Sequence, residues 1–515
     1  MNVPVIIVGA GPAGLMLAGE LRLAQVEVMV LEKLSEPTGE SRGLGFTART
    51  MEVFDQRGLL PRFGDIETSS YGHFGGLPVD FSLLDGAHFA AKTVPQARTE
   101  EVIAEWAAEL GADIRRGCEV TGFTDDGEGV DVAVTTPDGP LRLRASYLVG
   151  CDGGRSTVRK LAGFDFPGTA ATREMFIADV KGCEIRPRVI GETVPGGMAM
   201  GGPIGDGITR IVACERGAPP RKRTAPPAFA EVAGAWQRLT GEDIHAGTPQ
   251  WISAFGDATR QVTEYRRGRV LLAGDAAHIH LPAGGQGMNA SIQDSVNLGW
   301  KLGAVVRGWA PPGLLDSYHG ERHPVGVRLL MNTQAQGLLF LTGDEAQPLR
   351  AVLAELIELE SVSRHLAGMV TGLDIRYAVG PGTHRLLGSR MPHEELDAVT
   401  VKTSTTELLR TGRGVLLDLA DDEVLRRTAA AWSDRVDRVT AKPVTKTETG
   451  ALLAAEAVLL RPDGHIAWIT PGSDRGLTEA LERWFGSPTT TQTTPPTQAM
   501  RVPVTAGTGS GKETR

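Results

Sequence analysis

The stretch "VPVIIVGAGPAGLMLAGELRLAQVEVMVLE", residues 3–32, predicts how the chain begins to fold. Residues 3–8 form an apolar run typical of a buried strand, and a glycine-rich segment, a helical pattern and a second apolar run follow. Two parallel strands and their crossover helix need about 30 residues, which matches this stretch. The sequence therefore predicts an α/β fold that opens with a strand, a helix and a parallel strand.

Three glycines and one acid give this unit a dinucleotide-binding pattern. Gly9 permits a tight turn, Gly11 lets a pyrophosphate approach the backbone, and Gly14 lets the helix pack on the strand. Glu32 ends the second strand, where a carboxylate can bind the hydroxyls of a ribose. An acid at this position disfavours a 2′-phosphate, so the pattern suits FAD or NAD better than NADP. The glycines alone are also typical of a structural turn, and the prediction depends on the strand, the helix and Glu32 together.

A second motif is "YLVGCDGGRSTVRK", residues 147–160, in which an apolar strand delivers Asp152 into a turn that begins a helix. Aspartate is a preferred residue before the first turn of a helix, so a structural cap is one interpretation. A carboxylate at the carboxyl end of a strand also lies where open α/β sheets bind ligands. The two interpretations are compatible, and both stay open at this stage.

A third motif is "GDAAHIHLPAGGQGMNASIQDSVNLGWKL", residues 274–302, which follows another buried strand. Its glycines at 284, 285 and 287 allow the backbone to approach a flat or anionic group. A helix is predicted to start near Met288 and Asn289, with its N-terminus pointing back into the loop. The N–H groups at such a terminus would stabilise the negative charge of a reduced flavin.

Composition excludes several classes of partner. A chain of 515 residues predicts two or three domains, and a net charge of −9 with no dense basic run argues against nucleic acid. The apolar run at residues 5–21 lacks the basic segment of a signal peptide, and no other segment approaches a membrane span. These features predict a cytoplasmic protein without a membrane partner, which binds small polar or aromatic molecules.

Metal and disulfide chemistry are also not predicted. The four cysteines are far apart and form no CxxC pair or Cys/His metal spacing: Cys118, Cys151, Cys183 and Cys214. His278 and His280 lie in the third motif without Cys, Asp or Glu at a familiar ligand spacing, which favours loop hydrogen bonding over metal ligation. A proton-transfer role for either histidine stays open.

The rest of the chain alternates between strand-rich and helical regions. Residues 112–150 and 176–264 show strand patterns, the latter interrupted by the loop "ERGAPPRKRTAPPA", and residues 289–370 show helical patterns. A second α/β pattern begins near residue 395, and the Thr/Pro/Gln/Gly-rich tail at 487–515 is predicted to be disordered.

Taken together, "GAGPAG" with Glu32, "DGGRS" and "GDAAHIHLPAGGQGMN" resemble the three flavin fingerprints of the group A flavoprotein monooxygenases, the single-component aromatic hydroxylases. The segments "ESRGLGFTARTMEVFDQRGLL" and "TVPQARTEEVI" resemble the aromatic polyketide hydroxylases of that group, and most of all the angucycline-type hydroxylases. The flavin likeness covers roughly residues 3–380, and the closer likeness extends to the C-terminal "LLRPDGHIAW".

The resemblance implies a fold of three parts. A Rossmann-like FAD-binding domain would comprise residues 1–70, 93–175 and 265–385, and a mostly β substrate domain, residues 71–92 and 176–264, would be inserted into it. A thioredoxin-like domain would follow at residues 395–486. That region contains no cysteine, so disulfide chemistry is excluded there and a structural or dimerisation role is expected.

The resemblance also implies a role for each position that matches the family pattern. The pyrophosphate would be held by Gly9, Gly11, Pro12, Ala13 and Gly14, and the adenosine end by Glu32, Lys33 and the backbone around Val120. The diphosphate and ribityl region would contact Arg42, Gln96 and Asp275, while Asp152 would serve both flavin and NADPH binding. The ring would be bound by Pro282 over its face and by the backbone of Gly287, Met288 and Asn289 at its pyrimidine edge.

The activity implied by the resemblance is hydroxylation of an aromatic polyketide in antibiotic biosynthesis. Tightly bound FAD would be reduced by transient NADPH and react with O2, and a flavin C4a-hydroperoxide would transfer oxygen to an electron-rich phenol. No protein group is predicted to act as catalyst, and a homodimer is left open. Two alternatives are a Baeyer–Villiger oxygenase acting on a related polyketide and a non-catalytic flavin-binding scaffold.

Overall fold

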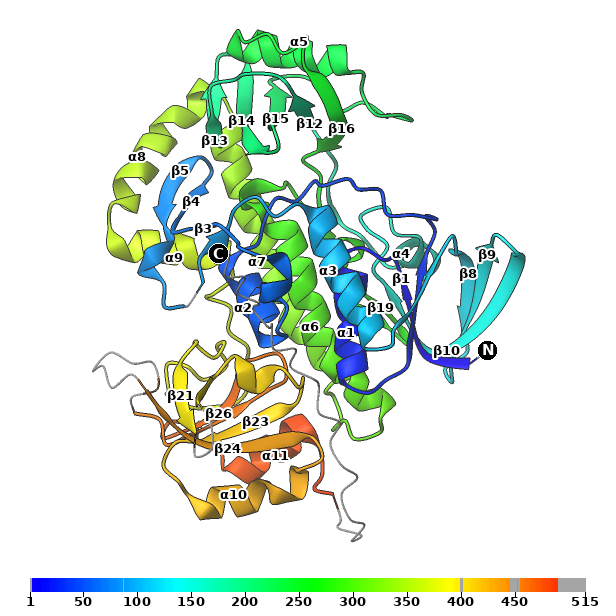
Figure 1. Cartoon of the computed structure of the whole chain (residues 1–515), viewed down its shortest axis with the longest axis vertical. Helices are drawn as coiled ribbons and strands as arrows, with labels where there is room; N and C mark the ends of the chain where they lie inside the picture. Colours follow the sequence, from blue (N-terminus) through cyan, green and yellow to red (C-terminus); the bar gives the residue numbers. More distant parts are fainter. Residues whose placement is uncertain (1, 87, 399–401, 445–451, 453, 490–515) are drawn as a thin grey trace, which may run out of the picture.

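The computed structural model describes residues 2–86, 88–398, 402–444, 452 and 454–489 (Figure 1). Its largest sheet has eight strands, and six of them follow the order β18-β19-β10-β1-β2-β7. These strands are β18 Arg266–Arg267, β19 Val270–Leu272, β10 Gly139–Gly150, β1 Asn2–Val8, β2 Val28–Glu32 and β7 Asp113–Arg116. The strands from β19 to β7 run parallel, as the opening stretch of the sequence predicts.

The remaining two strands, β8 Glu119–Asp125 and β9 Val130–Thr136, pair antiparallel beside β10 and confirm the short strands predicted for residues 112–150. One face of the parallel sheet packs on helices α1 Pro12–Leu23, α3 Gln96–Glu109 and α6 Gln286–Val306 (Figure 1). Helix α6 lies close to α1 because Gly299 faces Glu20 and Gly303 faces Ala24; a Cβ at either glycine would lie within 2.5 Å of the opposite side chain. The helices α1 and α6 are therefore in direct contact along their length.

A separate five-stranded sheet, which we call the middle sheet because it comes from the middle of the sequence, lies at one end of the molecule (Figure 1). Its antiparallel order is β13 Arg188–Val194, β14 Gly197–Gly205, β15 Ile208–Glu215, β12 Glu174–Lys181 and β16 Thr248–Gly256. Helix α5 Phe229–Thr240 covers one face of this sheet and buries Trp236 against it. The sequence predicts the strands of this region but not α5, which lies inside the strand-rich segment.

Three helices follow α6 in the chain, α7 Asp316–Leu341, α8 Gln347–Ile357 and α9 Glu360–Thr371, and α7 packs beside β13 and β14 of the five-stranded sheet. The hairpin of β4 Tyr71–Phe74 and β5 Leu77–Asp80 packs on α7 and α9 through Phe74, Phe81 and Leu339. This hairpin was grouped with the middle region by resemblance, and it forms a two-stranded sheet of its own rather than joining β12–β16.

The C-terminal part contains a six-stranded sheet with the order β22-β21-β24-β23-β25-β26. Its strands and helices are β21 Glu395–Ala398, β22 Lys402–Ser404, β23 Gly414–Asp418, α10 Glu423–Ala429, β24 Val436–Pro443, β25 Ala457–Leu460, β26 Ile466–Thr470 and α11 Leu477–Phe485. The predicted strands at "RGVLLDLA" and "AVLLRPDGHIAWI" and the final helix are confirmed. The short elements elsewhere are α2 Ala48–Gln56, β3 Thr68–Ser69, β6 Ala90–Ala91, α4 Thr157–Leu161, β11 Gly168–Thr169, β17 Thr259–Gln261 and β20 His278–Ile279.

The predicted disordered tail needs a correction at its start. Arg435 donates hydrogen bonds to the Ser487 carbonyl and the Thr489 hydroxyl, and the Thr489 amide donates to the Ala431 carbonyl. Residues 487–489 are therefore held against the C-terminal sheet, while the rest of the predicted tail, 490–515, lies outside the described residues. No helix among the residues that the structure describes is both long and apolar enough to cross a membrane.

Candidate functional site

The three sequence motifs meet at one edge of the parallel sheet. The Gly9 amide donates to the Leu31 carbonyl, the Cys151 amide to Val8, and the Ala273 amide to Gly150. Each of these hydrogen bonds joins the residue after one strand to the end of its neighbour. The turns after β1, β2, β10 and β19 therefore lie side by side, at the carboxyl edge where open α/β sheets bind ligands.

The glycine-rich turn leaves open space where a diphosphate is predicted. Gly9 has φ +105°, and a Cβ there would lie 2.5 Å from the Cys151 carbonyl oxygen. A Cβ at Gly14 would lie 2.0 Å from the Gly9 oxygen, so this glycine is required for packing of the helix on the turn. Gly11 differs from both because a Cβ there would meet nothing within 4 Å. Gly11, followed by Pro12 and Ala13 in the first turn of α1, leaves space in which a diphosphate could approach the backbone.

Glu32 lies at the end of β2 beside this turn. Its carboxylate accepts hydrogen bonds from the Ala10 amide at 2.9 Å and from the Leu34 amide at 2.9 Å. A carboxylate has about four acceptor positions, so lone pairs remain for the hydroxyls of a ribose. Lys33 follows on the surface and is exposed.

Asp152 binds the first turn of α4, but the N-cap residue of this helix is Ser156 and not, as one interpretation of the sequence expects, Asp152. Its carboxylate accepts hydrogen bonds from the Ser156 hydroxyl and from the amides of Thr157, at 2.6 Å, and Val158, at 3.1 Å, at the start of α4. Asp152 is half-buried at the carboxyl end of β10, and a Cβ at the adjacent Gly153 would meet nothing within 4 Å. The hydrogen bonds of Asp152 to α4 therefore leave open space beside it at Gly153.

Asp275 is exposed although its neighbours Gly274 and Ala276 are buried, which places its carboxylate on the open side of the turn. The turn is tied to the second motif by Arg159, which donates to the Ala276 carbonyl at 2.9 Å and to the Gly154 carbonyl at 2.7 Å. Because Arg159 is buried, these hydrogen bonds hold the Asp152 and Asp275 turns in a fixed relative position.

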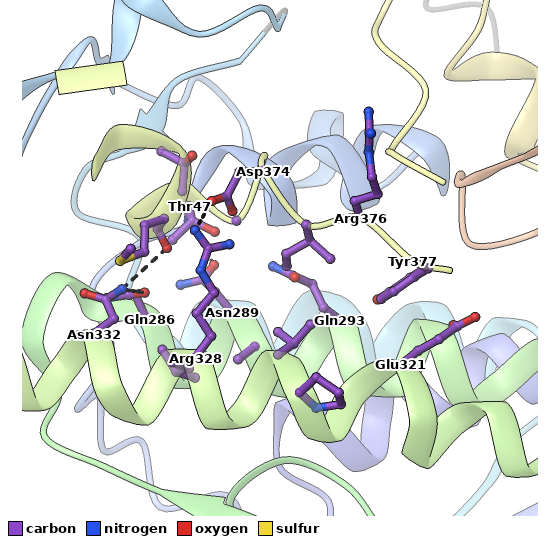
Figure 2. A pocket seen from close by; sticks show the side chains of 18 of the residues that line it. Thr47, Gln286, Asn289, Gln293, Glu321, Arg328, Asn332, Asp374, Arg376 and Tyr377 are labelled. Carbon is purple, nitrogen blue, oxygen red and sulfur yellow. Dashed lines mark hydrogen bonds and ion pairs between the residues drawn. The ribbon is translucent and has the colours of Figure 1, made fainter. Parts of the chain in front are cut away.

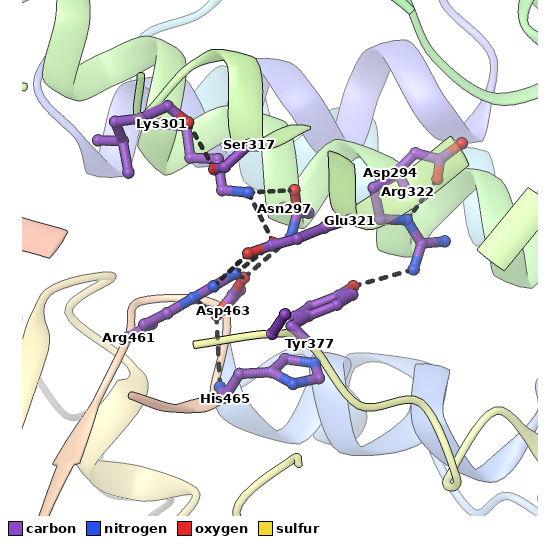
Figure 3. A network of polar contacts seen from close by, with 12 residues as sticks. Asp294, Asn297, Lys301, Ser317, Glu321, Arg322, Tyr377, Arg461, Asp463 and His465 are labelled. Carbon is purple, nitrogen blue, oxygen red and sulfur yellow. Dashed lines mark hydrogen bonds and ion pairs between the residues drawn. The ribbon is translucent and has the colours of Figure 1, made fainter. Parts of the chain in front are cut away.

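The polar network behind this turn was not predicted. His278 Nε2 contacts Asp294 Oδ2 at 2.8 Å, and the same oxygen accepts from the Gly274 amide at 3.1 Å. Arg322 donates to the other Asp294 oxygen at 2.6 Å and to the Tyr377 hydroxyl at 3.1 Å (Figure 3). Burial by itself would raise the pKa of Asp294, but the charges of Arg322 and His278 hold it below its ordinary value.

His278 is therefore a buried hydrogen-bonded residue, as the loop interpretation of this histidine expects. His280 lies nearer the predicted flavin loop and shares a hydrogen bond of 2.8 Å with the Leu281 carbonyl. Burial lowers the pKa of His280 to about 4, so its ring is neutral near pH 7 and its Nδ1 is the donor in this bond. Among the described residues, no group of three or more His, Cys, Asp or Glu side chains could hold a metal ion.

The N-terminus of α6 faces the same opening. The helix starts at Gln286, two residues before the predicted start, and Gly285 precedes it in a left-handed conformation with no side-chain cap. The amides of the first turn, including those of Gly287 and Met288, therefore lack a capping side chain. Pro282 is exposed just before this turn.

Asn289 joins the start of α6 to the segment that covers it. Its side-chain oxygen accepts from the Thr47 amide at 2.9 Å, and its Nδ2 donates to the Gly285 carbonyl at 2.8 Å. Asn289 thus contributes a positioning side chain as well as the backbone that the resemblance implies.

The other predicted contacts lie around this opening. Gln96 accepts a hydrogen bond from the Gly43 amide at 3.3 Å, and a Cβ at Gly43 would lie 3.6 Å from the Met288 sulfur. Arg42 is exposed, and its guanidinium donates to the Ser253 hydroxyl of the middle sheet at 3.3 Å. Val120 is buried at the start of β8 near the end of β2, where the Cys118 amide donates to the Glu32 carbonyl. Gly43, Gln96 and Met288 therefore lie close together, with Arg42 next to Gly43 in the chain.

The middle sheet presents its second face to this opening. Met175 and Ile177 of β12, Met198 of β14 and Val212 of β15 pack with Leu281 and Ala283 of the flavin loop. Further along the same strands, Arg210 pairs with Asp179 at 2.6 Å and approaches the Arg42 carbonyl at 3.5 Å. The face is apolar beside the loop and charged near Arg42.

These observations fit FAD. Along the edge of the sheet, Glu32 lies at the end of β2, the open space at Gly11 follows β1, and the outward carboxylate of Asp275 follows β19. The uncapped amides of α6 come next in the chain after the Asp275 turn. Amides at a helix N-terminus favour an anionic group, which suits the electron-rich end of an isoalloxazine. The residues present would therefore accept the adenosine ribose at Glu32, the diphosphate at Gly11, the ribityl chain at Asp275 and the flavin ring at the start of α6, which is the covalent order of FAD.

Two family models match the chain. The FAD binding domain matches residues 2–333, and the C-terminal part of the aromatic-ring hydroxylases matches residues 384–488.

Close relatives share nearly the whole length. The structure of CabE, an aromatic hydroxylase from angucycline biosynthesis, is 68% identical with a TM-score of 0.93, and the match covers 95% of this chain and 100% of CabE. The 12-dehydrotetracycline 5-monooxygenase/anhydrotetracycline 6-monooxygenase of Streptomyces rimosus is 44% identical over 95% of this chain and 100% of the relative. Rifampicin monooxygenase of Streptomyces venezuelae is 46% identical, and the match covers 94% of this chain and 99% of the relative.

Proposed function

This chain belongs to the family of FAD-dependent aromatic-ring hydroxylases, and we propose that it hydroxylates a polycyclic phenol of the angucyclinone class with NADPH and O2 as co-substrates. It is a flavoprotein monooxygenase that acts on an aromatic polyketide in antibiotic biosynthesis. The proposal concerns the substrate class, the reductant and the residues that take part.

The single observation that carries the proposal is the position of the apolar face of the middle sheet. It packs directly against the loop that precedes α6, where the flavin ring would be bound. Apolar side chains such as Met175 and Met198 suit an aromatic substrate, and burial of such a substrate excludes water from the reacting atoms.

In this proposal FAD supplies the redox chemistry, because it accepts a hydride from NADPH and activates O2. Gly9, Gly11 and Gly14 bring the backbone to the diphosphate, Glu32 binds the ribose, and Asp275 holds the chain that leads to the ring. Asp152, Gln96, Arg42, Lys33 and the backbone at Val120 complete the cofactor contacts that the resemblance implies. The amides of Gly287 and Met288 stabilise negative charge on the ring.

No acid or base on the protein needs to activate the substrate, because a phenol is already electron-rich. His280, whose pKa burial lowers to about 4, is neutral at working pH, and no catalytic role is assigned to it. The protein instead orients one ring carbon and keeps the reacting space dry. Pro282, exposed at the edge of the loop, lies where it would border the ring face.

The remaining parts of the proposal concern architecture. The middle sheet and α5 form the inserted substrate domain, and the C-terminal sheet is a thioredoxin-like domain without cysteine, so its role is structural. The oligomeric state of the purified chain, with and without this domain's exposed surface altered, would show whether the domain also forms the interface of a homodimer.

The test uses the purified chain loaded with FAD. We expect a yellow protein whose NADPH oxidation accelerates when an angucyclinone-like phenol is added, with NMR locating the new oxygen as a hydroxyl on a ring carbon. An oxygen inserted into a carbon–carbon bond would instead assign the Baeyer–Villiger alternative. Flavin binding without any turnover of such phenols would contradict the proposal.

A further inference from the structure

A groove lies on the opposite side of α6 from the flavin-binding edge. It has a volume of about 530 Å³ and lies between α6, α7 and the segment 371–378 that crosses over them (Figure 2). We call it the α6–α7 groove, and its walls include Thr47, Gln293, Gly320, Arg376, Arg483 and Trp484. Its volume falls in the range of small-molecule sites, roughly 300–1,000 Å³.

One helix separates this groove from the proposed flavin site. Gln286, Asn289 and Gln293 follow one another at helical spacing and line the groove. Ser291 lies on another face of α6, and its hydroxyl is 2.8 Å from the position of a Cβ at Gly274 in the Asp275 turn. The α6–α7 groove is therefore a separate space that shares the first turn of α6 with the flavin site.

The groove contains polar groups without partners. Thr47 is 6% exposed and Trp484 is 4% exposed, yet neither Thr47 Oγ1 nor Trp484 Nε1 forms a hydrogen bond within the described part of the chain. The Gln293 side chain, which points into the groove in Figure 2, has no hydrogen bond to a described residue either. A buried donor without a partner costs about 1–3 kcal/mol. A ligand in the groove would satisfy these groups.

The floor of the groove is open at Gly320. A Cβ at this position would meet nothing within 4 Å. Pro324 lies inside α7 one turn later and has no N–H to donate to the Gly320 carbonyl, so the helix leaves an acceptor free there. The floor therefore combines space for a flat molecule with an acceptor for a hydroxyl group.

The charge at the end of the groove nearest α11 is positive. Arg376 and Arg483 line the groove and form no ion pair with any described residue, although Arg483 donates to the Ala378 carbonyl at 3.3 Å. The carboxylates nearby are already paired, since Asp374 binds Arg328 at 2.6 Å and Glu321 binds Arg461 at 2.6 Å. Two cations without counter-ions favour an anionic ligand.

We propose that the α6–α7 groove is a second binding site, which takes a flat polycyclic hydroxyquinone with an ionised hydroxyl. The rings lie over Gly320, the anionic edge faces Arg376 and Arg483, and the remaining polar atoms pair with Gln293 and Trp484. This choice of ligand rests on the proposed function, because hydroxylation of a polycyclic phenol yields products of this chemical class.

Calorimetric titration of the FAD-loaded full chain tests the site with two probes, anionic anthraquinone-2-sulfonate and neutral 2-(hydroxymethyl)anthraquinone. The variant G320F fills the groove, whereas V327F adds the same ring to the outward face of α7, where Val327 is 51% exposed. We expect G320F to remove one binding event that V327F retains, with FAD content unchanged in both.

A double variant, R376Q/R483Q, tests the charge. We expect affinity for the sulfonate to fall about five- to tenfold, as for partly exposed ion pairs, with less than about twofold change for the neutral probe. Unchanged titrations of G320F, or equal effects of the double variant on both probes, would overturn the inference.

Turnover of NADPH with a phenol on the same samples separates the two proposals. If the wild type hydroxylates the phenol but G320F binds the probes as the wild type does, only the proposal of a second site in the α6–α7 groove is contradicted. If G320F loses a binding event but the wild type hydroxylates no phenol, the proposed substrate chemistry is contradicted, whereas ligand binding in the α6–α7 groove is supported.

Discussion

At the scale of single residues, the site depends on which atoms face the open edge of the sheet. Gly11, Asp275 and Glu32 could be predicted from sequence because each lies within a short motif whose backbone geometry is local. Asp294 and Arg322 could not, because their significance comes from contacts with Gly274 and Tyr377, which are distant in sequence. A lone acid in the middle of a helix carries no local signal of such partners.

The second and third glycines of the first motif, Gly11 and Gly14, should respond differently to alanine. In G11A the new methyl meets no protein atom, so we expect normal stability but a loss of FAD binding, because the methyl enters the diphosphate cradle. In G14A the methyl would lie 2.0 Å from the Gly9 oxygen, so overpacking of about 1–3 kcal/mol should lower the melting temperature. Thermal unfolding and flavin absorbance check both variants. Equal melting temperatures for the two apo-proteins would contradict the conclusion that Gly14 is closely packed in this turn and Gly11 is not.

Asp275 should contribute directly to FAD affinity. The variant D275N keeps the shape but removes the charge, and we expect the dissociation constant for FAD to rise about 10- to 100-fold, equivalent to a lost charged hydrogen bond of roughly 1.5–3 kcal/mol. Flavin fluorescence titration of the apo-protein measures the constant. D316N, a change at an exposed aspartate that begins α7, is the matched control and should bind as wild type. Equal constants for the two variants would show that Asp275 is misplaced.

At the scale of elements, the pattern predicts the main strands and the helices from α6 to α9, but not the exact boundaries or helices such as α3 and α5. Helix α5 is short and interrupts a strand-rich region, and its apolar face is recognisable only against the sheet that it covers. The start of α6 at Gln286 depends on the left-handed Gly285, a backbone choice that composition does not reveal. Contact between α1 and α6, by contrast, follows from small residues at Gly299 and Gly303.

Glycine-to-alanine changes in two helices should have opposite effects. In G299A the methyl would lie 2.4 Å from Glu20 Cβ, and Glu20 is held by a buried ion pair with Arg57 at 2.6 Å, so we expect a loss of about 1–3 kcal/mol. In G320A the methyl points into open space within α7, and the gain in helix propensity is about 1 kcal/mol. Thermal melts of both holoproteins provide the comparison. A stable G299A variant would contradict the close packing of α1 on α6.

At the scale of the whole molecule, a buried polar network joins the C-terminal part to the FAD-binding part. Glu321 of α7 pairs with Arg461 at 2.6 Å and with Lys301 of α6 at 2.7 Å, and Arg461 also pairs with Asp463 (Figure 3). The existence of a separate C-terminal α/β region could be predicted from sequence. How it docks could not, because the network joins residues about 140 positions apart whose charges are individually ordinary.

His465, next to this network, should make the protein sensitive to acid. Burial lowers the pKa of His465 to about 3, whereas this side chain in the unfolded chain takes up a proton near pH 6.5. The contribution of neutral His465 to the free energy of unfolding is therefore fully present above pH 6.5 and decreases as the pH falls toward 3. In H465Q this proton uptake is absent. The difference in the free energy of unfolding between wild type and H465Q should therefore shrink by about 1.4 kcal/mol for each pH unit below 6.5. Melting temperatures of both proteins between pH 7 and pH 5 measure this. Parallel curves would contradict a neutral buried His465.

The proposed reaction places oxygen from O2 on a ring carbon of a polycyclic phenol that is bound by the FAD-loaded chain. The most direct test is turnover with NADPH and an angucyclinone-like phenol under ¹⁸O2, followed by mass spectrometry and NMR of the product. We predict one labelled oxygen atom per hydroxylation, present as a phenolic hydroxyl, and no label when the reaction is run in H2¹⁸O with ordinary O2. A product whose new oxygen comes from water, or a phenol recovered unchanged while the flavin is reduced and reoxidised, would contradict the account.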